Sequence, residues 1–149
     1  MKVLILNGSP RVGGNTTTAI KEMEAVFEAE GIEYETIQVG NKDIRGCIAC
    51  GKCGQTGKCV FDDIVNEVAE KFEAADGLVV ASPVYYASSQ YWNSIHGGGA
   101  GDAQQDEEGK RTMRVLARNM SFLMKSIALG KEKYGLPEEE DRVFTNFIR

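Results

Sequence analysis

Three segments of the chain carry the residue types that binding chemistry requires. Residues 8–17, GSPRVGGNTT, combine three glycines with three hydroxyl side chains and an arginine. Residues 82–86, SPVYY, end in two adjacent tyrosines. All four cysteines of the chain fall within residues 47–59. These compositions predict, in turn, a site for an anion, a wall for a flat aromatic group, and a metal or redox centre.

The glycine-rich segment comes immediately before a predicted helix. Free backbone N–H groups and the positive end of a helix dipole favour a phosphate at such a place. Ser9, Thr16 and Thr17 can add hydroxyl donors, and Arg11 can supply charge. The segment has neither the G-x-x-x-x-G-K-[ST] pattern of nucleotide triphosphatases nor the G-x-G-x-x-G dinucleotide pattern. It therefore predicts a phosphate site, with a simple glycine-rich turn and helix cap as the alternative.

The tyrosine pair, Tyr85 and Tyr86, follows a predicted buried strand. Tyrosine rings stack on π-systems, and backbone groups of the same loop can reach the heteroatoms of a ring. The alternative is that the pair packs against a helix. A phosphate pocket beside an aromatic wall predicts a mononucleotide that carries a large planar ring.

The cysteines follow the pattern Cys47-x2-Cys50-x2-Cys53-x5-Cys59. Such tight spacing lets one loop surround a compact centre, and four thiolates suit an iron–sulfur cluster. Zinc sites more often use two C-x2-C pairs that are separated by about a dozen residues or more. The spacing leaves three hypotheses: a 4Fe–4S cluster, a zinc ion, or no metal.

The elements that must position these segments alternate between strand and helix. Apolar runs predict strands, and apolar residues at helical spacing predict helices. Asn15–Thr16 is predicted to cap the first helix and Asp62 the second. On the first helix the predicted apolar face is Ile20, Met23 and Phe27, with Ala19 and Val26 beside them. On the last helix we expect the inward side chains to be Met113, Leu116, Met120, Leu123 and Ile127. The predicted strands are residues 2–7, 34–39 and 77–82, and the predicted helices are 15–30, a helix that begins after residue 62, and 110–133.

This alternation predicts an α/β fold, a parallel sheet with helices on both faces. Ligands of such sheets bind beyond the carboxyl ends of the strands, at the switch point. In a 2-1-3 strand order, the loops 8–15 and 82–90 face one site. With three strands, however, the apolar strand 77–82 lies at an open edge, which invites aggregation. We infer that an omitted segment or a partner chain covers this edge.

Composition restricts the class of protein. The 149 residues fit one domain, residues 1–149, with a Cys-rich loop at 46–60. A net charge of −5 argues against a nucleic-acid partner. No apolar run is long enough to span a membrane, and the first residues do not form a secretory signal. We therefore expect a cytoplasmic protein.

The segments GSPR…GNT at 8–16 and ASPVYY at 81–86 resemble the NADPH-dependent FMN reductase and iron–sulfur flavoprotein family. The resemblance covers residues 1–88. It implies a doubly wound, flavodoxin-like sheet in three layers, α/β/α, and a homodimer or homotetramer. It also implies FMN as cofactor. The residues so placed at its phosphate are Ser9, Arg11, Asn15, Thr16 and Thr17, and those along its ring are Pro83, Val84, Tyr85 and Tyr86.

Family members carry two further strands and a helix where this chain joins Ser88 to Ser89. By the usual length of such units, about 60 residues of sheet and crossover are absent. The iron–sulfur branch of the family implies a 4Fe–4S cluster on Cys47, Cys50, Cys53 and Cys59. We thus expect an oxidoreductase that moves electrons from NAD(P)H through FMN, or an electron carrier that exchanges with a ferredoxin-like partner. A non-enzymatic zinc or interaction module is the third possibility. No catalytic side chain is predicted, since the flavin supplies the chemistry.

Overall fold

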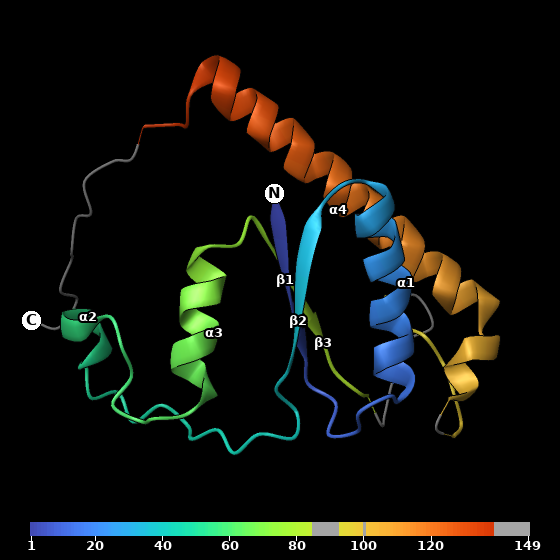
Figure 1. Ribbon diagram of the computed structural model, residues 1–149, viewed down its shortest axis with the longest axis horizontal. Helices are drawn as coiled ribbons and strands as arrows, with labels where there is room; N and C mark the ends of the chain where they lie inside the picture. The colour runs from blue at the N-terminus through green and yellow to red at the C-terminus, as the bar shows by residue number, and fades with distance from the viewer. Residues whose placement is uncertain (85–92, 100, 139–149) are drawn as a thin grey trace, which may run out of the picture.

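The structure is a computed structural model, and it describes residues 1–84, 93–99 and 101–138 (Figure 1). Strands and helices alternate through its first half, as the sequence predicts. The predictions for Tyr85, Tyr86 and the Ser88–Ser89 junction lie outside the described residues. The strands are β1 (Lys2–Asn7), β2 (Glu33–Gln38) and β3 (Gly77–Ala81), and the helices are α1 (Asn15–Ala29), α2 (Cys53–Thr56), α3 (Ile64–Glu73), the 3₁₀ helix η1 (Asp102–Gln105) and α4 (Glu107–Tyr134).

The three strands form a parallel sheet in the order β2-β1-β3. This order confirms the predicted 2-1-3 arrangement. Val3 pairs with Tyr34 and with Gly77, so the strands begin at one rim of the sheet and end together at the other. Because side chains alternate along a strand, Val3 and Ile5 face one layer of helices and Leu4 faces the other.

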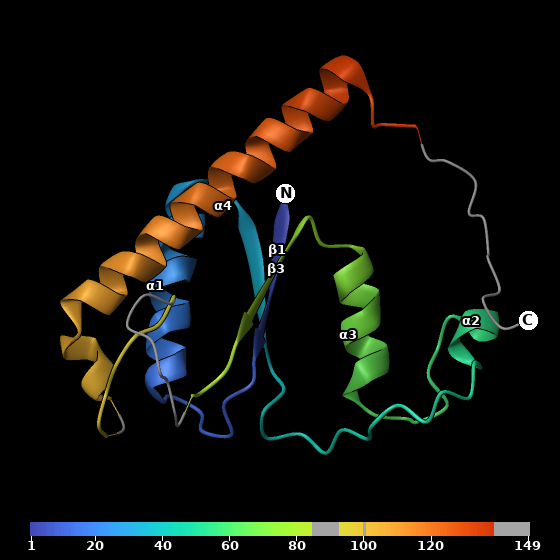
Figure 2. The same cartoon turned by 180° about the vertical axis from the view of Figure 1, so that it is seen from behind.

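Helices α1 and α4 cover one face of the sheet, and α3 lies on the other, which gives the predicted three layers (Figures 1 and 2). The core lies between β1, α1 and α4, and each of its buried side chains is at most 8% exposed. The apolar residues that the sequence places inward on α1 are all part of it. The α1 contribution is Ala19, Ile20, Met23, Val26 and Phe27.

The other face of the sheet is more open. Leu4 is fully buried there, but α3 buries none of its own side chains, and Phe72 is 55% exposed. An ion pair between Lys71 and Glu35 ties α3 to β2. The helix begins one residue later than predicted, since the side chain of Asp63 rather than Asp62 caps it by accepting from the N–H of Val65 at 2.9 Å.

Helix α4 is longer than predicted, and part of its expected inward face is wrong. Met113 is buried, but Leu123 is 57% and Ile127 is 65% exposed. The helix turns Ala117, Ser121 and Met124 into the core instead. The reason is the narrow sheet, since β3 is its last described strand on this side and Leu123 is not among the described residues that pack against the core. Among the described helices, none combines the length and apolar character needed to cross a membrane.

Candidate functional site

The turns after β1 and β3 meet at the carboxyl rim of the sheet. The N–H of Gly8 donates to the carbonyl oxygen of Ala81 at 2.7 Å. The turn after β2 joins them, because the N–H groups of Val39 and Gly40 donate to the carbonyl oxygen of Asn7 at 2.9 and 3.1 Å. The convergence predicted from strand order is therefore present in the structure (Figure 1).

Within residues 8–17, two hydroxyl groups act as hydrogen-bond acceptors. Ser9 Oγ accepts from the N–H of Arg11 at 3.2 Å. Thr17 Oγ1 accepts from Asn7 Nδ2 and from the N–H of Gly13, both at 3.3 Å. A hydroxyl that accepts keeps its own proton to donate. No described residue takes the proton of either hydroxyl, so both remain available to an anionic oxygen.

The first turn of α1 is not capped by a side chain. Its N-cap residue is Gly14, and the prediction that Asn15 and Thr16 cap the helix is wrong. The first N–H bonded back along the helix belongs to Thr18, which donates to the carbonyl oxygen of Gly14 at 3.2 Å. No described acceptor takes the N–H groups of Asn15, Thr16 and Thr17, so these are the unpaired donors that this helix start presents to an anion.

The side chain of Asn15 hydrogen-bonds to a segment that lies far along the chain. Its Nδ2 donates to the carbonyl oxygens of Gly97 at 3.3 Å and Gly99 at 3.1 Å. Its Oδ1 accepts from the N–H groups of Gly101 at 3.2 Å and Ala103 at 3.3 Å. Asn15 therefore fastens the segment that leads into α4 against the start of α1, a role that no pattern in the sequence indicates.

Asp106 holds the other end of the segment that leads into α4. Its carboxylate accepts from the N–H groups of Gly109 at 2.9 Å and His96 at 2.7 Å, and it lies 3.5 Å from His96 Nδ1. These hydrogen bonds hold the pKa of Asp106 below its ordinary value of 3.8 because they stabilise the charged form, and the one from Gly109 has the largest effect. Glu107 and Glu108 follow in the first turn of α4, near the positive end of the helix dipole.

The remaining predicted phosphate residues, Arg11 and Thr16, lie on the same rim. Arg11 is exposed and has no ion-pair partner among the described residues, whereas Thr16 is buried at the start of α1. On the ring side, Pro83 is half-buried and Val84 is 71% exposed, just after β3. The structure thus brings the described part of both predicted segments to one place.

The cysteine segment forms a separate loop on the α3 side of the molecule (Figure 2). All four thiols are free, and Cys47, Cys50 and Cys53 are exposed. Only Cys59 is anchored, since its N–H donates to Asn66 Oδ1 of α3 at 2.7 Å. The described residues contain no group of three ligands placed to hold a metal ion. The donor set suits a soft metal or a cluster, but the loop would have to close around it.

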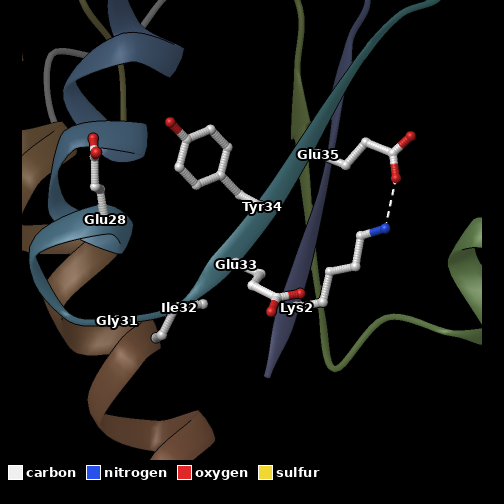
Figure 3. A pocket seen from close by; sticks show the side chains of 7 residues that line it. All are labelled: Lys2, Glu28, Gly31, Ile32, Glu33, Tyr34 and Glu35. Atoms are coloured by element: carbon white, nitrogen blue, oxygen red, sulfur yellow. Dashed lines mark hydrogen bonds and ion pairs between the residues drawn. The ribbon is translucent and has the colours of Figure 1, made fainter.

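A broad depression lies at the opposite rim of the sheet. It has a volume of about 650 Å³ and borders the beginning of β2, with Lys2, Glu28, Tyr34 and Glu35 on its walls (Figure 3). Figure 3 shows Tyr34 directed toward α1 and Glu35 on the opposite face, where it pairs with Lys2 at 2.6 Å. This depression contains none of the predicted site residues, so volume alone does not locate the site.

Two features of the site were not predicted. A Cβ atom on Gly40 would lie 2.3 Å from the carbonyl oxygen of Gly8, so the turns after β1 and β2 require glycine at this contact. The side chain of Gln38 donates to the carbonyl oxygen of Ser9. For the contact of Gly40 with Gly8, the only signal in the sequence was a glycine after an apolar strand. For the hydrogen bond of Gln38 to Ser9, the sequence contained no signal.

A parallel 2-1-3 sheet with an uncapped, glycine-rich helix start at its carboxyl rim defines a flavodoxin-like protein. The chain belongs to the NADPH-dependent FMN reductase family, whose model matches residues 1–89. A solved structure of RosB with bound 8-demethyl-8-formylriboflavin-5'-phosphate shares the fold, with a TM-score of 0.56 and 17% identity over 100% of this chain and 94% of that one.

Curated relatives are named iron–sulfur flavoproteins. The chain is 32% identical over 148 residues to one from Methanocaldococcus jannaschii, a match that covers 99% of this chain and 72% of the relative. It is 41% identical over 85 residues to one from Methanosarcina thermophila, a match that covers 57% of this chain and 44% of the relative. The chain therefore spans less than half of the second relative, and the family model ends at residue 89, where the sequence predicts an interrupted sheet.

Proposed function

We propose that the chain binds FMN at the junction of the turns after β1 and β3 and acts as an oxidoreductase that passes electrons from NAD(P)H to an acceptor. The observation that carries this proposal is the direct contact of these turns, Gly8 N–H to Ala81 oxygen at 2.7 Å, beside an uncapped helix start. One turn offers donors for a phosphate, and the other leads into the aromatic pair.

In this proposal the phosphate is held by groups whose donors no described residue takes. Ser9 and Thr17 contribute the hydroxyl protons that their own hydrogen bonds leave free. Thr16 contributes its hydroxyl, and Arg11 contributes charge that no described carboxylate neutralises. Asn15 contributes its backbone N–H, because its side chain holds the segment 97–103. Hydrogen bonds to a charged oxygen are the stronger kind, which favours this arrangement.

The flavin ring lies along Pro83, Val84, Tyr85 and Tyr86 in this proposal. FMN supplies the redox chemistry when it is bound, by accepting a hydride or single electrons and releasing them to an acceptor. The protein's own residues then have to place the ring and exclude water from one of its faces. Exposed apolar side chains such as Val84 suit that task, and no side chain has to act as an acid or base.

A second candidate is an iron–sulfur flavoprotein that carries electrons to or from a ferredoxin-like partner. Two observations support it: the four free thiols within residues 47–59, and the name shared by the curated relatives. In this proposal Cys47, Cys50, Cys53 and Cys59 bind a 4Fe–4S cluster after the loop closes around it. Free, exposed thiols also agree with a reducing compartment, so we place the protein in the cytoplasm.

A visible spectrum of anaerobically purified protein separates these candidates. Flavin bands that bleach with NAD(P)H support the first proposal. Flavin bands with an added broad shoulder, bleached by reduced ferredoxin but not by NAD(P)H, support the second. A colourless protein that contains zinc and does not take up FMN would contradict both and would leave a zinc or interaction module.

A further inference from the structure

A pocket lies beside the proposed phosphate turn, between α1 and the segment that leads into α4. It has a volume of about 370 Å³, and its walls include Gly13, Thr17, Lys21, Gln104 and Lys110. Sites for small molecules occupy about 300–1,000 Å³, so the pocket is large enough for a small ligand. The described residues that line it come from the turn before α1, from α1, η1 and α4, and none comes from the open edge of the sheet at β3.

The pocket continues the proposed phosphate site along α1. Thr17 and Gly13 belong to both, and the Oγ1 of Thr17 accepts from the N–H of Gly13 at 3.3 Å. Ser9 and Arg11, on the other side of the phosphate turn, are not among the residues that line the pocket. Lys21 follows Thr17 by four residues, so the two side chains share a face of the helix. The pocket therefore extends the phosphate site toward α4 rather than coinciding with it.

Hydrogen bonds within the chain fix the wall of the pocket that η1 forms. The Oδ1 of Asn15 accepts from the N–H groups of Gly101 at 3.2 Å and Ala103 at 3.3 Å. These bonds hold η1, which carries Gln104, against the start of α1 (Figures 1 and 2). The pocket is therefore shaped before a ligand arrives, which lowers the entropic cost of binding.

The pocket carries positive charge. Among the described residues, Glu22 is the one carboxylate on its walls, and Arg114 neutralises it at 2.5 Å. Lys21 is exposed and has no ion-pair partner in the described part of the chain. Lys110 pairs with Glu107 at 2.5 Å, yet its side chain is 15% exposed whereas that of Glu107 is 76% exposed. An ammonium group has three donors, so Lys110 retains donors for an anion in the pocket.

We infer that this pocket is a subsite for the adenylate half of FAD, so that the chain takes the flavin dinucleotide as well as FMN. The inference rests on the proposed function, because FAD is FMN joined to AMP through a diphosphate. The two phosphates share one oxygen atom, so the second must lie immediately beside the first. Lys21 and Lys110 supply positive charge for it there. The amide of Gln104 supplies a donor and an acceptor for the ribose or the base.

The test is isothermal titration calorimetry of the flavin-free chain with FAD and, separately, with FMN. FAD should bind at least as tightly as FMN. Lys110→Gln should weaken FAD binding about tenfold, because the ammonium group of Lys110 is largely shielded from water. Lys21→Gln should weaken it about threefold, because the side chain of Lys21 is exposed. Both variants should bind FMN as the unchanged chain does, since FMN ends at the first phosphate.

Lys131→Gln is the matched control, because it removes the same charge from an exposed position about 30 Å farther along α4. It should leave both affinities unchanged. FAD that binds tenfold more weakly than FMN would overturn the inference alone, whereas a chain that binds neither flavin would overturn the proposed function as well. The inference also fails if Lys110→Gln and Lys21→Gln affect FAD no more than Lys131→Gln does, or if they weaken FMN as much as FAD.

Discussion

Gly40 lies directly against the backbone of Gly8, so that a Cβ atom on Gly40 would come within 2.3 Å of the Gly8 carbonyl oxygen and 2.4 Å of Ser9 C. This contact sets the position of the proposed phosphate turn relative to β2. Gly40→Ala forces the turns apart, because backbone atoms cannot rotate away as a side chain can. We expect a loss of about 1–3 kcal/mol in the free energy of unfolding, the usual cost of overpacking, together with weaker FMN binding.

Gly46→Ala provides the matched control for Gly40→Ala. A Cβ atom on Gly46 meets nothing within 4 Å, and its φ is not positive. Urea denaturation and FMN titration of the two variants measure the difference. Equal stability and equal affinity in both would show that the close approach at Gly40 does not position the site.

Thr17 offers a test of the hydroxyl donors. Its Oγ1 accepts from Asn7 and Gly13, which leaves its proton for the phosphate in our proposal. Thr17→Val keeps the shape of the side chain and removes the hydroxyl. A hydrogen bond to a charged group contributes about 1.5–3 kcal/mol, so FMN affinity should fall about tenfold or more.

Thr18→Val is the control for Thr17→Val, since it makes the same change one residue along α1. Fluorescence titration with FMN compares the two. If Thr17→Val binds FMN as the unchanged protein does, the phosphate is not held at this hydroxyl.

Asn15 holds the segment 97–103 through four backbone groups, and two substitutions separate these contacts. Asn15→Ala removes all four hydrogen bonds, so amide exchange at Gly101 and Ala103 should become faster. Asn15→Asp keeps the acceptor for these two N–H groups and loses the donor to Gly97 and Gly99. Exchange at Gly101 and Ala103 should then stay slow. Fast exchange in the Asp variant would contradict the assigned pattern of donors and acceptors.

Asp106 makes stability depend on pH in acid. Its pKa is lower in the folded protein than its ordinary value of 3.8, because Gly109 and His96 donate backbone hydrogen bonds to the carboxylate. The stabilisation is therefore complete above the unfolded pKa and is lost as the pH falls through the folded pKa. The Asp106→Asn variant cannot lose a charge there. The difference in unfolding free energy between the two proteins should shrink as the pH falls below about 4.

Thermal denaturation of the unchanged protein and Asp106→Asn from pH 6 downward measures this difference. Other carboxylates, such as Glu35 beside Lys2 and Lys71, titrate in both proteins and cancel in the comparison. A difference that is constant with pH would rule out the assigned role of Asp106.

The sequence was sufficient to predict what depends on periodicity and chain order. The alternation of apolar runs predicted the strands, the buried face of α1 and the 2-1-3 order that brings Gly8 to Ala81. It could not predict which side chains fasten loops that lie far apart in the chain. The four hydrogen bonds of Asn15 join residues more than 80 positions apart, and no local pattern encodes them.

The errors on α4 and α3 have one physical cause. Helical periodicity identifies apolar faces, but whether such a face is buried depends on what the sheet places beneath it. Leu116 and Leu123 are both predicted to face inward, yet Leu116 packs against the core, whereas Leu123 is 57% exposed. The cap at Asp63 rather than Asp62 is a smaller error of the same kind, since both residues are acceptable caps and only the backbone path selects one.

A comparison of FMN with riboflavin, which carries the same ring without the phosphate, tests the proposed phosphate site most directly. Fluorescence titration of the purified chain should show saturable binding of one FMN per chain. Riboflavin should bind about tenfold more weakly or worse, because it leaves the donors of residues 9–17 unused. Equal affinity for the two flavins, or no binding of FMN, would contradict the central claim that the turns after β1 and β3 hold a phosphorylated flavin.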